Sequence, residues 1–242
     1  MPEGQPSALI APLPVQTWAF VAVCAIAGAL AVPPHAVASP ASAFVAGLTG
    51  LFGLRVWRWS HLPSSMKSEA PHGVVRLVLP AVSMGLGLVV GLLLLGVIRL
   101  VIEPAVPAAG ARIAAAAALP VWRRIVIIYV AAVSEEVLFR LLLLSLVAGL
   151  ATRLVRGADE VQNRRLAWVA NGFSAFAFAA AHFPPWRAVG PMSPGLTLMV
   201  LTLNGLGGVV FGYIFIRRGI LAAIWAHAGA DCAIQLIGPF TG

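Results

Sequence analysis

Charged residues are scarce in this sequence. Asp, Glu, Lys and Arg together make up 10% of its 242 residues, whereas soluble domains carry roughly 25%. Hydrophobic residues account for 60%, and they come in long runs rather than in short alternations. The composition therefore excludes an ordinary soluble domain and predicts an all-α, polytopic transmembrane helical bundle.

Cysteine and clustered basic charge are also lacking. The only cysteines are Cys24 and Cys232, both inside apolar runs, so no disulfide framework or CxxC motif is present. We expect both to be packing residues. The net charge is +8, but the basic residues lie in short loops between apolar runs, without interleaved aromatic residues. This pattern indicates orientation in a membrane and argues against nucleic acid as a partner.

The motifs of two large groups of hydrolases are missing. Neither HExxH, the helical zinc-protease signature, nor GxSxG, the nucleophile elbow, occurs. Ser134 and Ser145 have no base beside them in the sequence. Residues 1–14 lack the basic region of a signal peptide, so we interpret the first apolar run as a retained span.

The apolar runs define the predicted organisation, because a spanning helix needs about 20 apolar residues. Segment 111–119 is too short to span and ends before Pro120, so we expect it to be re-entrant, interfacial or the start of the fourth span. We predict a single integral-membrane domain, residues 1–242, multi-pass in the cell membrane, with about seven spans and between six and eight as limits. The runs are 15–32, 41–57, 74–98, 122–150, 166–183, 195–216 and 220–238.

Small and polar residues inside these runs predict how the helices pack. GxxxG pairs, which let two helices approach closely, begin at Gly87 and at Gly208. Asn171 and Asn204 also lie within runs, and we expect each to make a hydrogen bond to another helix.

The run 125–150 carries three charged residues at its middle: Glu135, Glu136 and Arg140. At the centre of a bilayer each such residue costs about 2.5–3.5 kcal/mol on insertion scales. Glu136 and Arg140 are four residues apart and share a helical face, in the favourable order for an ion pair. Glu135 points about 100° away. The sequence therefore favours Glu135 for chemistry, and Glu136 with Arg140 for support.

Partners for Glu135 come from two later runs. His182 closes the string Phe178-Ala-Ala-Ala-His182, and His227 opens the string His227-Ala-Gly-Ala-Asp231. Each i, i+4 spacing puts two side chains on one helical face. Isolated polar residues are costly in a membrane, so we expect both histidines, Asp231 and the glutamates to share one polar site. The other histidines lie in or near loops: His35, His61 and His72.

Such a site suits hydrolysis. A buried carboxylate can take a proton from water, a histidine can share that water, and a second polar pair can stabilise an oxyanion. The same residue types bind zinc, so a divalent metal held among Glu135, His182, His227 and Asp231 stays open. Two other functions fit these residues: a proton- or ion-coupled carrier, although no duplicated half is apparent, and a non-catalytic, immunity-type binding protein.

Three motifs together resemble a known family. SEEVLFR fits E-E-x-x-x-R, FAAAH fits F-x-x-x-H and HAGAD fits H-x-x-x-N/D, all in the expected order. Over about residues 120–238 the sequence is similar to the CAAX prenyl protease and bacteriocin-processing family of intramembrane proteases, called CPBP or Abi. The resemblance implies an endopeptidase that cleaves a membrane-associated or C-terminally anchored protein or peptide, as a glutamic protease or a metalloprotease.

The resemblance also implies residue roles. Glu135 would act as general base on water, and His182 would help to hold that water. Glu136 and Arg140 would hold the helix and the first glutamate in place.

His227 and residue 231 would stabilise the oxyanion, but this sequence has Asp231 where many members have Asn. An ionised Asp cannot donate a hydrogen bond. Asp231 must therefore be protonated, orient His227 or ligate a metal.

Overall fold

A computed structural model describes residues 15–31, 39–60, 62, 74–155, 157–187 and 191–241. Within these residues every regular element is a helix and no strand occurs, which confirms the predicted fold class. Residues 1–14 and the loop histidines His35, His61 and His72 lie outside the described residues.

Each predicted apolar run coincides with a helix or with helices in line. The N-terminal half contains α1 (Val15–Leu30), α2 (Ser39–Ser60), α3 (Val74–Val97), η2 (Ile98–Ile102), α4 (Glu103–Ala105) and α5 (Pro107–Ala117). The central long helix consists of α6 (Val121–Glu135), η3 (Glu136–Leu144) and α7 (Ser145–Leu154). The remainder contains α8 (Glu160–Ala181), α9 (Phe183–Arg187), α10 (Pro194–Arg218), α11 (Ile220–Cys232), η4 (Ala233–Ile237) and η5 (Gly238–Phe240).

Four stretches of the described chain are long and apolar enough to cross a membrane: Val78–Ala105, Glu160–Arg187, Pro194–Arg218 and Ile220–Phe240. The apolar helix α1 is shorter. Large apolar side chains on the outside, such as Leu93 and Val169, are each 67% exposed, as expected for side chains that face lipid. The protein is thus a helical membrane bundle, while the number of seven spans stays a prediction.

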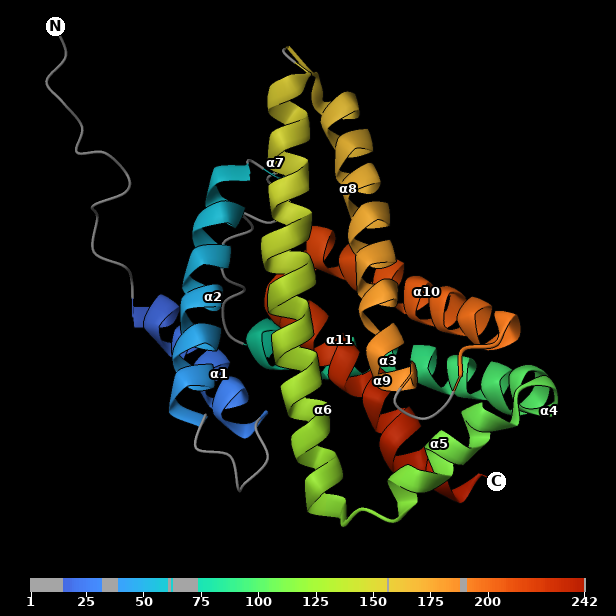
Figure 1. Ribbon diagram of the computed structural model, residues 1–242. Helices are drawn as coiled ribbons and strands as arrows, with labels where there is room; N and C mark the ends of the chain where they lie inside the picture. The colour runs from blue at the N-terminus through green and yellow to red at the C-terminus, as the bar shows by residue number, and fades with distance from the viewer. Residues whose placement is uncertain are drawn as a thin grey trace, which may run out of the picture.

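The long helix of α6, η3 and α7 forms the axis of the bundle (Figure 1). α1 and α2 pack together on one side of it, and α2 contacts η3 and α7. α8 packs against α7, α10 against α8, and α11 against α3 and α6. Cys24 lies in the core between these helices, in agreement with its predicted packing role, whereas Cys232 is half-buried; both cysteines are free.

Local signals fix where the helices that carry the site begin and turn. Asp159 and Gln162 form a capping box at the start of α8, in which the backbone N–H of Gln162 donates to Oδ1 of Asp159 at 2.7 Å. The hydroxyl of Ser193 accepts a backbone N–H in the first turn of α10. Gly219, at φ 84°, makes the turn from α10 into α11, a conformation that favours glycine.

Close helix packing occurs at both GxxxG pairs, as predicted. A side chain on Gly87 would collide with the Ala226 carbonyl, so α3 lies directly against α11. A side chain on Gly208 would be crowded by α8 in the same way. The predicted interhelical hydrogen bond of Asn171 is also confirmed, since its amide donates to the Val209 carbonyl at 3.0 Å.

The corresponding prediction for Asn204 is wrong. Its amide donates to the Val200 carbonyl of its own helix at 2.8 Å. The helix opens onto a cavity at this point, and the carbonyl one turn earlier is the acceptor within reach.

Candidate active site

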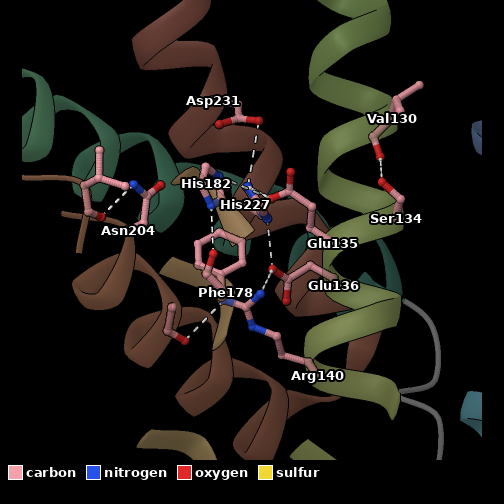
Figure 2. A network of polar contacts seen from close by, with 12 residues as sticks. Val130, Ser134, Glu135, Glu136, Arg140, Phe178, His182, Asn204, His227 and Asp231 are labelled. Atoms are coloured by element: carbon pink, nitrogen blue, oxygen red, sulfur yellow. Dashed lines mark hydrogen bonds and ion pairs between the residues drawn. The ribbon is translucent and has the colours of Figure 1, made fainter. Parts of the chain in front are cut away.

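A cavity of about 570 Å³ lies between α3, α5, α6, α8, α10 and α11. Its walls are mostly apolar, with residues such as Leu94, Ile127 and Leu203. Polar side chains enter it from several helices, and Figure 2 shows Glu135, His182, His227 and Asp231 close together. These polar side chains include Glu135 from α6, His182 from the end of α8, Asn204 from α10, and His227 and Asp231 from α11.

Glu135 faces both histidines without touching either. Its Oε2 lies 3.7 Å from Nε2 of His227 and 4.0 Å from Nε2 of His182. Nε2 of His227 lies 3.8 Å from Oδ2 of Asp231. These separations are too long for direct hydrogen bonds and suit polar groups that share a bridging water. The four groups therefore lie close together on the wall of the cavity.

Glu136, the next residue, is fully buried and engaged. Its Oε1 lies 3.1 Å from Nη1 of Arg140 and 2.8 Å from Nδ1 of His227. A carboxylate only accepts hydrogen bonds, so Nδ1 of His227 carries the hydrogen and donates it. Glu136 consequently turns Nε2 of His227 toward the cavity. The sequence predicted the pair with Arg140, but it held no signal for the bond to His227, because those residues lie on different helices.

Arg140 is 1% exposed and is surrounded by compensating groups. Its Nη2 donates to the Gly208 carbonyl at 3.3 Å. Its guanidinium lies 4.4 Å from the ring centre of Phe178 and 5.7 Å from that of Phe211, which adds cation–π attraction in a dry site. Phe178, the first residue of the FAAAH string, thus packs on the buried cation, a role that sequence reasoning missed.

His182 is oriented by the backbone of its own helix. Its Nδ1 lies 2.8 Å from the Phe178 carbonyl. A carbonyl accepts, so this nitrogen donates and leaves Nε2 to face Glu135. The ring of His182 also packs edge-on against the ring of Phe178 at 4.7 Å. Both histidines therefore present Nε2 to the same carboxylate.

The backbone from Glu136 to Leu144 is π-helical, so the α-helical period assumed from the sequence is wrong for this segment. The pair of Glu136 and Arg140 still forms, because residues four apart remain neighbours in the wider turn. The hydroxyl of Ser145 donates to the Arg140 carbonyl at 3.3 Å. Such wide turns are frequent at functional sites, and nothing in this apolar sequence marks one.

Neither serine of the central helix is placed as a nucleophile. The Ser134 hydroxyl donates to the Val130 carbonyl at 2.5 Å (Figure 2). The Ser145 hydroxyl is likewise held by its own helix. Both hydrogens are engaged with backbone oxygens rather than with a base.

Metal binding is the other use of these side-chain types. Within the part of the chain that the structure describes, no three His, Cys, Asp or Glu side chains are arranged to hold a metal ion. The donors at the cavity, His182, His227, Asp231 and Glu135, do not fit a metal centre as they are placed.

Residues 117–233 match the family model described as type II CAAX prenyl endopeptidase Rce1-like. This segment belongs to the CAAX protease family. The match agrees with the resemblance carried by the three motifs, all of which lie within it. No curated protein and no solved structure matches the chain.

The matched family is one of membrane-embedded peptidases, so this segment supports that broad class. A family of this kind implies a membrane-associated protein as substrate. The CAAX protease segment contains every side chain of the polar site, from Glu135 to Asp231.

Proposed function

We propose that this protein is an intramembrane endopeptidase in which Glu135 activates water to hydrolyse a peptide bond. The substrate is a membrane-associated or C-terminally anchored protein or peptide. One observation carries the proposal: among the described residues, the Glu135 carboxylate makes no direct hydrogen bond and faces two imidazole nitrogens, at 3.7 and 4.0 Å, beside an apolar cavity. The match to a CAAX endopeptidase family supports hydrolysis over ion transport.

The reaction starts with a water held between Glu135 and His182, whose facing atoms lie 4.0 Å apart. Glu135 takes one proton as the water oxygen attacks the carbonyl carbon of the scissile bond. That proton passes to the leaving nitrogen as the C–N bond breaks. The second proton of the water leaves the new carboxyl group for the amine, so a carboxylate and an ammonium group result, and Glu135 returns to its ionised form.

Charge develops on the carbonyl oxygen during attack, and His227 is the donor we assign to it. With Nδ1 engaged by Glu136, a proton on Nε2 points into the cavity. The carboxylates of Glu135 and Asp231, both within 4 Å of Nε2, attract a positive charge on this ring. Asn204 lies at the same cavity and has a second amide hydrogen to offer.

Support for this geometry comes from Glu136 and Arg140, which hold His227 in place, and from the surrounding helices.

We propose that residues 1–242 form one membrane domain, with residues 120–238 as its catalytic core, and that it resides in the cell membrane. The cavity volume of about 570 Å³ falls within the usual range for ligand sites. Its apolar walls suit apolar side chains, or a lipid chain, next to the scissile bond.

The test uses purified protein in lipid vesicles with membrane-anchored peptides, with and without a prenyl group. Mass spectrometry identifies the new termini. Glu135→Gln and His182→Ala should abolish cleavage while the protein still inserts. Glu160→Gln is the matched control, because Glu160 is 82% exposed and pairs with Arg164 far from the cavity. Full cleavage by either site variant would overturn the proposal, and solute transport blocked by the same changes would favour a carrier.

A further inference from the structure

One aromatic side chain at the cavity lies outside the three sequence motifs and has no part in the hydrolysis proposed above. Phe211 comes from α10 and is 3% exposed. Its ring lies nearly parallel to the ring of His227, with the ring centres 4.7 Å apart and an interplanar angle of 15°. Phe178 meets the same imidazole edge-on, at 5.8 Å and 77°. Among the described aromatic residues, Phe211 is thus the one that covers a face of His227.

The imidazole of His227 needs a second restraint besides its hydrogen bond. Its Nδ1 donates to Oε1 of Glu136 at 2.8 Å (Figure 2), which fixes one atom of the ring but leaves the tilt of its plane free. The parallel contact with Phe211 restricts that tilt, because the flat face of one ring packs against the flat face of the other. The two contacts together set the direction in which Nε2 points.

Two carboxylates lie just beyond hydrogen-bond distance of this Nε2. Oε2 of Glu135 is 3.7 Å away and Oδ2 of Asp231 is 3.8 Å away, whereas N–H···O bonds form at about 2.7–3.2 Å. A tilt that moves Nε2 by roughly 1 Å would therefore close one of these bonds. Such a bond would withdraw the N–H from the developing oxyanion, and a bond to Glu135 would also engage the general base.

We propose that Phe211 is a positioning residue: its ring, stacked on His227, keeps Nε2 of that imidazole clear of the two carboxylates and aimed at the scissile carbonyl. This inference rests on the proposed function, in which His227 is the oxyanion donor. The ring face also attracts the positive charge of an imidazole that carries both of its hydrogens. An aliphatic side chain of similar size would fill the space without supplying that attraction or a flat surface.

The first experiment replaces Phe211 by leucine and by tyrosine and measures cleavage of an anchored peptide in vesicles. A misplacement of about 1 Å can cost about 10²-fold in rate, so Phe211→Leu should lower kcat by about 10- to 100-fold and leave KM within about twofold. Phe211→Tyr keeps a flat ring and should recover most of the rate. Phe215→Leu is the matched control, because Phe215 is 0% exposed one turn further along α10 and does not line the cavity. It should lower stability and leave kcat unchanged.

If Phe211 only fills the core, Phe211→Leu and Phe215→Leu will behave alike, with lowered unfolding midpoints and wild-type kcat, and that result would overturn the proposal. A rise in KM with kcat unchanged would assign Phe211 to substrate binding and overturn it as well. Equal kcat values for Phe211→Leu and Phe211→Tyr would contradict the need for a flat ring.

A double-mutant cycle tests whether Phe211 acts through His227. His227→Gln should lower kcat by about 10²–10³-fold, as the loss of an oxyanion donor does, and the remaining cleavage is followed with enzyme in excess over peptide. Adding Phe211→Leu to this variant should cause no further loss, because the imidazole that the ring positions is gone. A loss as large in this background as in wild type would show that Phe211 acts elsewhere.

A spectroscopic measurement separates this inference from the hydrolysis itself. In micelles, the carbon-bound ring protons of His227 should resonate upfield, because a stacked aromatic ring shields them, and His227→Gln identifies the signals by their loss. Phe211→Leu should move these signals downfield, whereas Phe215→Leu should not. The predicted shifts in a protein that cleaves nothing would keep Phe211 as the residue that orients His227 and remove the proposed function. Cleavage by wild type without an upfield displacement would do the reverse.

Discussion

Replacing each of the two adjacent glutamates by glutamine should produce opposite phenotypes. Glu135→Gln should lower the cleavage rate by about 10²–10⁴-fold, the usual contribution of a general base. It should leave the free energy of unfolding within about 0.5 kcal/mol of wild type. The side chain of Glu135 is 29% exposed, and its contacts in the described chain are ionic ones at 3.7 and 4.0 Å. Glutamine fills the same volume there.

Glu136→Gln should instead destabilise the protein. Glu136 is 0% exposed, and its Oε1 faces both Arg140 at 3.1 Å and His227 at 2.8 Å. Removing one partner of a buried ion pair costs about 3–5 kcal/mol, because the other charge is left uncompensated. A glutamine oxygen can still accept from His227, so we expect the lower end of this range, and Glu136→Ala should reach the upper end. Total stability is roughly 5–15 kcal/mol, so the loss is readily measured.

The assay pairs two measurements on the same preparations. Unfolding of each variant is followed in mixed micelles under denaturant, and cleavage of an anchored peptide is followed in vesicles. Wild-type stability in Glu136→Gln would refute the division of labour between the two carboxylates, as would substantial cleavage by Glu135→Gln. Lowered temperature should restore part of the activity of Glu136→Gln, and none of that of Glu135→Gln.

Three further predictions test other parts of the structure. Asp231→Asn supplies an amide donor and should keep cleavage within about tenfold of wild type, whereas Asp231→Leu should lower kcat by about 10²–10³-fold; equal rates in a peptide assay would contradict a role at the oxyanion. Gly87→Leu should force α3 away from Ala226 and destabilise the protein by roughly 1–3 kcal/mol, while Gly85→Leu, with open space at that position, should not; equal unfolding midpoints would contradict the packing. Excess chelator should leave cleavage unchanged, and a loss that zinc restores would show that metal ligands assemble in the working enzyme.

Much of the helical arrangement follows from the sequence, because a bilayer leaves the backbone few alternatives. Each apolar run forms a helix, and the small size of glycine lets the helices with GxxxG pairs pack closely against their neighbours. The proximity of Glu135, His182 and His227 was also predictable, since three isolated polar residues in lipid would each be costly. The spacing of residues within one helix therefore carried most of the information about the site.

What the sequence could not supply were contacts between helices and local changes of helical period. The bond from His227 to Glu136 depends on how α11 packs against the central helix. The position of Arg140 over Phe178 depends on α8 in the same way. The π-helical segment that starts at Glu136 contains no proline or glycine from which it could be predicted. Asn204 was assigned to packing because a polar residue in a span looks alike whether it faces a helix or a cavity.

The opposite surroundings of Glu135 and Glu136 explain why two adjacent carboxylates are useful here. Glu135 is the last residue of α6 and Glu136 the first of the π-helical segment. Glu135 faces Nε2 of His227, and Glu136 contacts Nδ1 of the same ring. Glu136 forms an ion pair with Arg140 and accepts a hydrogen bond from His227 in a dry interior. These contacts keep the imidazole in one orientation. Glu135 borders the cavity, where water can reach it and its protonation can change. A single glutamate could not do both, because a carboxylate that holds His227 and Arg140 cannot also accept a proton without releasing them.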